Sequence, residues 1–71
     1  MNMDTITVTL NGEPRTLAPQ TTLAALIAAT GQPPQALSTA VNGEFVAREA
    51  RAARALHNGD AVFTFQPITG G

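Results

Sequence analysis

Polar and apolar side chains alternate with a period of two over residues 4–10, where Ile6, Val8 and Leu10 share one face and threonines share the other. This alternation predicts a half-buried β-strand. Four more short stretches of strand-forming residues follow it, at 13–17, 38–41, 44–47 and 61–66. An Asn-Gly pair joins the first two strands and another joins the next two, and Asn-Gly supplies the positive φ angles of a tight turn. The pattern therefore predicts two hairpins and one final strand.

The segment between the two hairpins has the spacing of a short helix. Three apolar residues recur at helical intervals among alanines and are expected to lie in the core: Leu23, Leu26 and Ile27. Thr21 or Thr22 can cap the start of this helix, and Gly31 favours its end. The prolines of residues 32–35 indicate a connector.

The order of elements predicts an α+β fold in which a sheet of about five strands packs on one helix. Residues 48–56 fit either a helical turn or an irregular loop. In the last strand, either Phe63 and Phe65 or Val62 and Thr64 face the helix, and alternation alone does not say which pair does so.

Length and charge restrict the kinds of function. A chain of 71 residues forms one domain with one small core. The formal net charge is −1 and the charges are scattered, so no basic surface for nucleic acid is expected. The chain has no apolar run long enough to span a bilayer and no secretion signal, so we predict a cytoplasmic protein without a membrane partner.

The residue types exclude several chemistries inside the domain. Without cysteine or lysine the chain has no thiolate nucleophile, cysteine metal site or Schiff-base lysine. His57 and Asp60 flank an Asn-Gly pair and are interpreted as turn residues. Three arginines spaced three apart are interpreted as a solvated face, with contact to an acidic partner surface as the alternative: Arg48, Arg51 and Arg54. No catalytic residue and no metal site are expected.

The candidate reactive group lies in the last residues, Phe65-Gln66-Pro67-Ile68-Thr69-Gly70-Gly71. Pro67 cannot donate a hydrogen bond to a sheet, so we predict a folded domain over residues 1–66 and a flexible tail over 67–71 that reaches about 17 Å. Gly70 and Gly71 can pass through a narrow channel because they lack a Cβ atom. The ionised α-carboxylate of Gly71 can attack the α-phosphate of ATP and form an acyl adenylate.

Three parts of the sequence resemble the ThiS family, the sulfur carrier proteins of thiamine thiazole biosynthesis. The resemblance is strongest over Val41 to Glu49, Leu56 to Asp60 and Phe65 to Gly71, although Ala47 stands where the family usually has proline. It implies a ubiquitin-like β-grasp fold and a carrier that is not itself an enzyme and binds no cofactor.

The same resemblance implies the roles of partners and site residues. An E1-like enzyme would use ATP and magnesium to adenylate Gly71, with Gly70 as its access partner. A cysteine desulfurase route would supply sulfur for a thiocarboxylate that donates to thiazole synthase. We predict partner contacts at Arg48, Phe63, Phe65, Ile68 and Thr69.

Three alternatives stay open from the sequence. The small subunit of molybdopterin synthase is a sister carrier in which proline commonly precedes the glycine arm. A ubiquitin-like modifier would use the same activation but form an isopeptide bond with a target lysine. A stand-alone enzyme is the third alternative, disfavoured by the missing nucleophile and metal cluster.

Overall fold

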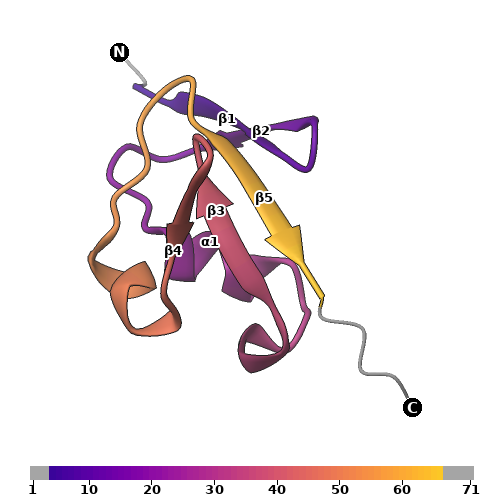
Figure 1. Cartoon of the computed structure of the whole chain (residues 1–71). Helices are drawn as coiled ribbons and strands as arrows, with labels where there is room; N and C mark the ends of the chain where they lie inside the picture. Colours follow the sequence, from indigo (N-terminus) through magenta and orange to yellow (C-terminus); the bar gives the residue numbers. More distant parts are fainter. Residues whose placement is uncertain (1–3, 67–71) are drawn as a thin grey trace.

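One mixed β-sheet and one α-helix form the fold of residues 4–66, the part of the chain that this computed structural model describes (Figure 1). The strands are β1 (Ile6–Leu10), β2 (Glu13–Leu17), β3 (Ser38–Val41), β4 (Glu44–Val46) and β5 (Ala61–Phe65). Their order across the sheet is β2-β1-β5-β3-β4, with β5 parallel to β1 and antiparallel to β3. The last strand in sequence is thus the central strand in space.

Both predicted hairpins are confirmed. Asn11 and Gly12 have φ angles of 53° and 88°, and Asn42 and Gly43 have φ angles of 53° and 84°. These paired positive angles are those of a type I′ turn, whose twist matches that of the flanking strands. β2 is an edge strand, the position in which Pro14 removes no hydrogen bond from the centre of the sheet.

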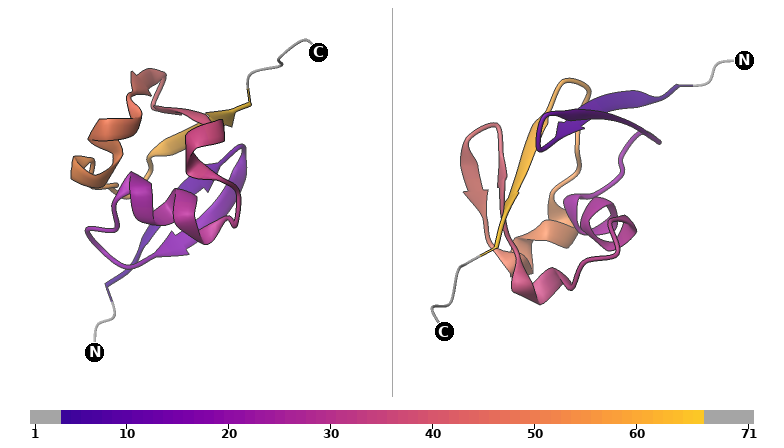
Figure 2. Two further views of the ribbon diagram at one scale, coloured as in Figure 1. Left: turned by 90° about the horizontal axis from the view of Figure 1, so that it is seen from below. Right: turned by 90° about the vertical axis from the view of Figure 1, so that its right-hand side faces the viewer.

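Helix α1 (Leu23–Ala29) crosses one face of the sheet (Figure 2). The Thr22 hydroxyl accepts a hydrogen bond from the Ala25 amide at 3.1 Å, so Thr22 is the cap of the two candidates. Thr21 instead donates its hydroxyl to the carbonyl of Ala18 at 2.7 Å. The helix ends at Thr30, and the following Gly31 has a φ of 79°.

The apolar side chains of the core between α1 and the sheet are all aliphatic. Its buried members are Val8, Leu10, Leu23, Leu26, Ile27, Leu37, Val41, Val46, Leu56 and Val62. The three apolar helix residues that the spacing predicted to be buried are among them. None of the three phenylalanines belongs to this core.

The central strand β5 resolves the ambiguity that alternation left open. Val62 is fully buried and lies opposite Leu10 and Val41 on the two neighbouring strands. Phe63 and Phe65 therefore point away from the helix, on the outer face of the sheet. The predicted β-grasp arrangement is confirmed for the described residues, while the predicted tail 67–71 lies outside them.

Two 3-10 helices occupy the connections on the helix side of the sheet. η1 (Pro34–Ala36) lies in the predicted connector, and η2 (Arg48–Ala53) forms most of the segment with the ambiguous pattern. After η2 the chain returns to the start of α1, where the Leu23 amide donates to the Arg54 carbonyl at 2.8 Å and the Leu56 amide donates to the Thr21 carbonyl at 2.8 Å.

The interpretation of the three arginines as one solvated face is wrong for Arg51. Its side chain is buried, with 3% of the residue exposed, whereas Arg48 is exposed and Arg54 is partly buried. The Arg51 guanidinium donates to the carbonyls of Pro34 and Leu37 and to the hydroxyl of Thr39. The Leu37 carbonyl and the Thr39 hydroxyl lie at the start of β3, where burial removes the water that would otherwise bond them, and the Pro34 carbonyl belongs to η1. The regular spacing of the three arginines could not show which of them is buried and hydrogen-bonded to such acceptors.

Candidate functional site

The outer face of the sheet carries every phenylalanine of the chain. In the strand register, Phe45 on β4 and Phe63 on β5 both lie opposite Ala40 of β3, and Phe65 lies opposite Ser38. Residues that pair directly across strands share one face, so the three aromatic side chains lie on the same side of the sheet. We call Phe45, Phe63 and Phe65 the aromatic face.

The aromatic face is exposed to an extent that the fold does not require. The exposed fractions are 71% for Phe45, 41% for Phe63 and 54% for Phe65. Small residues separate them on β3, so a partner can approach the rings closely. Grouped exposed aromatic side chains are typical of protein interaction surfaces. The aromatic face can therefore bind an apolar protein surface.

Two of the predicted contact residues, Phe63 and Phe65, belong to this face, but Phe45 was not among the predicted site residues. The period of two in β4 could have found it, because Val46 is buried and its neighbour must point outward. The sequence could not show that β4 and β5 flank the same strand. That neighbourhood requires the strand order of the folded sheet.

The aromatic face reaches the end of the described chain. Phe65 is the last residue of β5, and the exposed Gln66 follows it. The predicted site residues Ile68, Thr69, Gly70 and Gly71 lie outside the described residues. The predicted reactive end thus follows directly from the central strand, whose outer side carries two of the three phenylalanines.

Arg48, the remaining predicted contact residue, is exposed at the first position of η2. It lines a cleft together with Phe45 and Ser38. Since both of these residues point to the outer face of the sheet, the structure brings Arg48 to the border of the aromatic face. Its role in partner binding stays a prediction.

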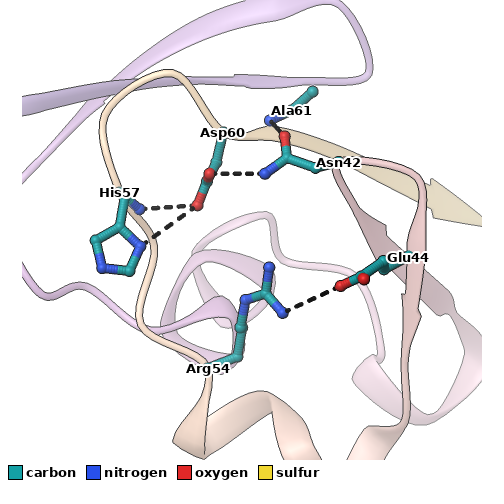
Figure 3. A network of polar contacts seen from close by, with 6 residues as sticks. All are labelled: Asn42, Glu44, Arg54, His57, Asp60 and Ala61. Atoms are coloured by element: carbon teal, nitrogen blue, oxygen red, sulfur yellow. Dashed lines mark hydrogen bonds and ion pairs between the residues drawn. The ribbon is translucent and has the colours of Figure 1, made fainter.

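At the opposite end of the sheet, a polar network joins the β3–β4 turn to the turn before β5 (Figure 3). Asp60 accepts from the His57 amide at 2.8 Å and from the Asn42 side chain at 2.9 Å, and Asn42 in turn accepts from the Ala61 amide at 2.9 Å. The interpretation of Asp60 as a turn residue that binds backbone amides is confirmed. Its bond to Asn42, 18 positions away, was not predicted.

The lowered pKa of the Asp60 carboxyl group supports a structural role for this network. Burial alone would raise the pKa of Asp60, but the His57 amide and the Asn42 side chain donate hydrogen bonds to the carboxylate, and His57 and Arg54 add positive charge. Together these contacts lower the pKa below its ordinary value of 3.8. The imidazole of His57 is 80% exposed and its Nδ1 lies 4.0 Å from Asp60, which confirms the exposed turn histidine.

The family model of ThiS matches residues 8–71 of this chain. The chain belongs to the ThiS family. Among curated protein sequences no match is found.

Two of the solved structures that resemble this member of the ThiS family illustrate the similarity. One is the thiamine biosynthesis protein ThiS of Geobacter metallireducens, with 30% identity, a TM-score of 0.81, and coverage of 93% of this chain and 100% of that one. The other is a computationally designed protein based on human erythrocytic ubiquitin, with 25% identity, a TM-score of 0.56, and coverage of 97% and 98% of the two chains. The fold is therefore ubiquitin-like.

In this ThiS-family chain, residues 4–66 contain no group of three or more histidine, cysteine or acidic side chains that could hold a metal ion. Within the same residues, α1 and the 3-10 helices all fall short of the length and apolar character that a membrane span requires. The candidate functional site of the described domain is thus the aromatic face with Arg48 at its border.

Proposed function

We propose that this chain is a sulfur carrier of thiamine biosynthesis that holds sulfur on the carboxyl end of Gly71. The observation that carries the proposal is the ThiS family match, which continues to residue 71 and so includes the glycine pair. The similar Geobacter protein is described as a thiamine biosynthesis protein. The aromatic face adds support, because a carrier needs a surface by which enzymes hold it.

The proposed chemistry takes place in three steps at the Gly71 carboxylate. An oxygen of the carboxylate attacks the α-phosphorus of ATP in an E1-like enzyme, and pyrophosphate leaves. A desulfurase moves the sulfur of cysteine to a partner thiol as a persulfide, whose outer sulfur attacks the acyl carbon, and AMP leaves with the electron pair of the broken C–O bond. A thiol reductant then cleaves the S–S bond of the resulting acyl disulfide and is itself oxidised to a disulfide. The product is a thiocarboxylate, whose sulfur passes to thiazole synthase. Magnesium acts in the activating enzyme, which supplies the catalytic groups.

This chain contributes recognition and reach to these steps. The aromatic face and Arg48 bind the partner enzymes, and Ile68 and Thr69 continue the contact along the tail. Gly70 and Gly71 enter the active site of the partner, where a side chain would obstruct the approach to ATP. A cytoplasmic location follows from the proposal, because the activating enzyme uses cytoplasmic ATP.

The two other ubiquitin-like roles share the activation step and differ afterwards. The small subunit of molybdopterin synthase would donate the same sulfur to a different acceptor, and a modifier would form an isopeptide bond with a lysine. The ThiS family match favours thiamine over both.

Intact-mass spectrometry tests the proposal. The full chain is incubated with an E1-like activating enzyme of thiamine biosynthesis, ATP, magnesium, cysteine, a desulfurase and dithiothreitol as the thiol reductant. We expect an AMP adduct when the sulfur source is omitted, and replacement of one oxygen by sulfur when it is present. Thiazole synthase should then return the carrier to its carboxylate form. Transfer of the sulfur to a molybdopterin precursor instead would reassign the pathway.

A variant that lacks Gly71 is the matched control. Its circular dichroism spectrum should equal that of the unmodified chain, because the core lies within the described domain. It should form neither adduct. An adduct of normal yield on this variant would contradict the proposal, since the reacting carboxylate would then not be that of Gly71.

A further inference from the structure

The buried guanidinium of Arg51 is the most unusual charged group of the described domain. It donates to three neutral oxygens: the Pro34 carbonyl at 2.9 Å, the Leu37 carbonyl at 2.6 Å and the Thr39 hydroxyl at 3.1 Å. A guanidinium carries five N–H groups, so these bonds leave two of them for another acceptor. The contacts orient the group without neutralising it.

No carboxylate of residues 4–66 pairs with Arg51. The ion pairs found there join Arg54 to Glu44 and His57 to Asp60, each at 4.0 Å. A buried cation is costly unless an anion or several hydrogen bonds compensate it. Carbonyl dipoles offset part of that cost. The electrostatic potential around Arg51 is therefore positive, and an anion bound there would stabilise the buried charge.

A cleft leads from the outer face of the sheet to the Arg51 side chain. It has a volume of about 300 Å³ and lies between the start of β3, the β4 strand and η2. Its lining includes Gln35, Ser38, Phe45, Arg48, Glu49 and Arg51. Because Phe45 and Ser38 point to the outer face, the cleft opens at the border of the aromatic face.

The charge and shape of the lining indicate the class of ligand. Two arginines and one glutamate leave a net charge of +1, which suits a monoanion better than a dianionic phosphate. Arginine presents planar pairs of N–H groups that match a carboxylate, and the serine hydroxyl and glutamine amide add donors. The wall formed by Phe45 accommodates the methylene groups of an acidic side chain.

We propose that this cleft receives an aspartate or glutamate side chain from the activating enzyme when that enzyme docks on the aromatic face. The inference rests on the proposed function, which identifies the activating enzyme as the partner. It adds that this enzyme presents a negatively charged side chain to the cleft. Arg48 closes over the carboxylate from the exposed side, and Arg51 binds it from the buried side. The acidic contact fixes the register of the docked domain.

The first experiment measures the dissociation constant of the full chain and the activating enzyme by calorimetry. Arg48→Gln should weaken binding about tenfold, because it removes one partner of a charge pair that the interface desolvates. Arg15→Gln is the matched control, since Arg15 lines a separate cleft of about the same volume that contains no buried arginine. The control should bind within about twofold of the unmodified chain. Equal effects of the two substitutions would overturn the proposal.

The second experiment needs no partner enzyme. Sodium acetate is added to the full chain at constant ionic strength, and the Nε–Hε signals of the arginines are followed by nuclear magnetic resonance. Saturable shifts at Arg48 and Arg51, with Arg15 unchanged, are expected. Arg51→Lys keeps the charge but loses the planar fork, and should abolish the shift at Arg48. Parallel shifts of all arginines, or none, would contradict a built site even if the lysine variant failed to fold.

These results separate the cleft from the proposed function. Normal adenylation of Gly71 without acetate binding, and with equal affinities of the two glutamine variants, would overturn the cleft alone. Specific acetate binding without any adenylation would support the cleft as a carboxylate site and count against the sulfur carrier role.

Discussion

The two ends of the same sheet use their side chains in opposite ways. At the turn end, defined by Asn42, Asn58 and Asp60, every one of these side chains is bonded within the domain. The carbonyl oxygen of Asn58 accepts from the Thr7 amide at 2.8 Å, and the Asn42 side chain donates to the Asp60 carboxylate at 2.9 Å. On the aromatic face, three large apolar side chains contact water instead.

This difference separates residues that hold the fold from residues that can bind a partner. A polar side chain whose hydrogen bonds are satisfied internally gains little from a ligand, however reactive its type. Asp60 is in this position, whereas the exposed imidazole of His57 makes only a 4.0 Å ionic contact with it. The exposed parts of the phenylalanine side chains can still gain free energy when a partner buries them.

The largest expected effect is on the aromatic face. Replacing Phe63 and Phe65 together by threonine, which retains the strand preference, should weaken binding to the activating enzyme about 100-fold. The free energy of unfolding should fall by no more than about 2 kcal/mol, because 41% of Phe63 and 54% of Phe65 are already exposed in the folded domain. Calorimetric titration and urea denaturation measure the two quantities.

The control for this double substitution is Thr16→Val on the edge strand β2, which is exposed on the same face of the sheet but distant from β4. It should leave affinity unchanged. If the double variant bound as tightly as the unmodified chain, the aromatic face would have no role in docking.

A smaller effect is expected at the turn end, where Asp60→Ala should reduce stability rather than binding. The substitution removes the acceptor of the His57 amide and of the Asn42 side chain, so the free energy of unfolding should fall by about 2 kcal/mol. Urea denaturation measures the change, with the exposed Asp4→Ala as control. A large loss of enzyme affinity at unchanged stability would reverse the assignment of the two ends.

Acid should produce the same loss gradually. The pKa of Asp60 lies below 3.8 in the folded state, so its stabilising contribution is complete above the pKa of the unfolded chain and disappears as the pH falls through the folded value. The stability difference between the unmodified chain and Asp60→Asn should thus be constant near neutral pH and shrink below pH 3.8. A difference that grew on acidification would contradict the lowered pKa.

The smallest effect is expected for His57→Ala. The imidazole is exposed, and the bond to Asp60 comes from the backbone amide, which alanine retains. Stability should stay within about 0.5 kcal/mol of the unmodified chain, and enzyme affinity should not change. A loss of sulfur transfer in this variant would show that the turn end takes part in the chemistry.

Local sequence was enough to predict most elements of the domain. The Asn-Gly pairs of the two hairpins predicted their turns, because few other residue pairs adopt two successive positive φ angles. The alternation of residues 4–10 and the helical spacing of Leu23, Leu26 and Ile27 identified buried faces directly. The ThiS resemblance was likewise carried by short motifs. The η2 segment was ambiguous because short 3-10 helices have no distinctive apolar period.

The candidate site was predicted only in part. Arg48, Phe63 and Phe65 were named from the sequence, but Phe45 joins them only because β3 lies between β4 and β5. Similarly, nothing in the spacing of Arg48, Arg51 and Arg54 distinguishes the one that is buried. These properties depend on which distant segments become neighbours.

By itself, the sequence determined the hairpin turns, the position of the helix, its buried residues Leu23, Leu26 and Ile27, and the family, since each of these depends on residues close together in the chain. Tertiary structure alone decided that β5 lies between β1 and β3, that its phenylalanines face outward and that Arg51 is enclosed by carbonyls. The physical reason is that strand pairing and burial arise from contacts between residues far apart in sequence, whose combined free energy selects one arrangement from several that the local pattern allows.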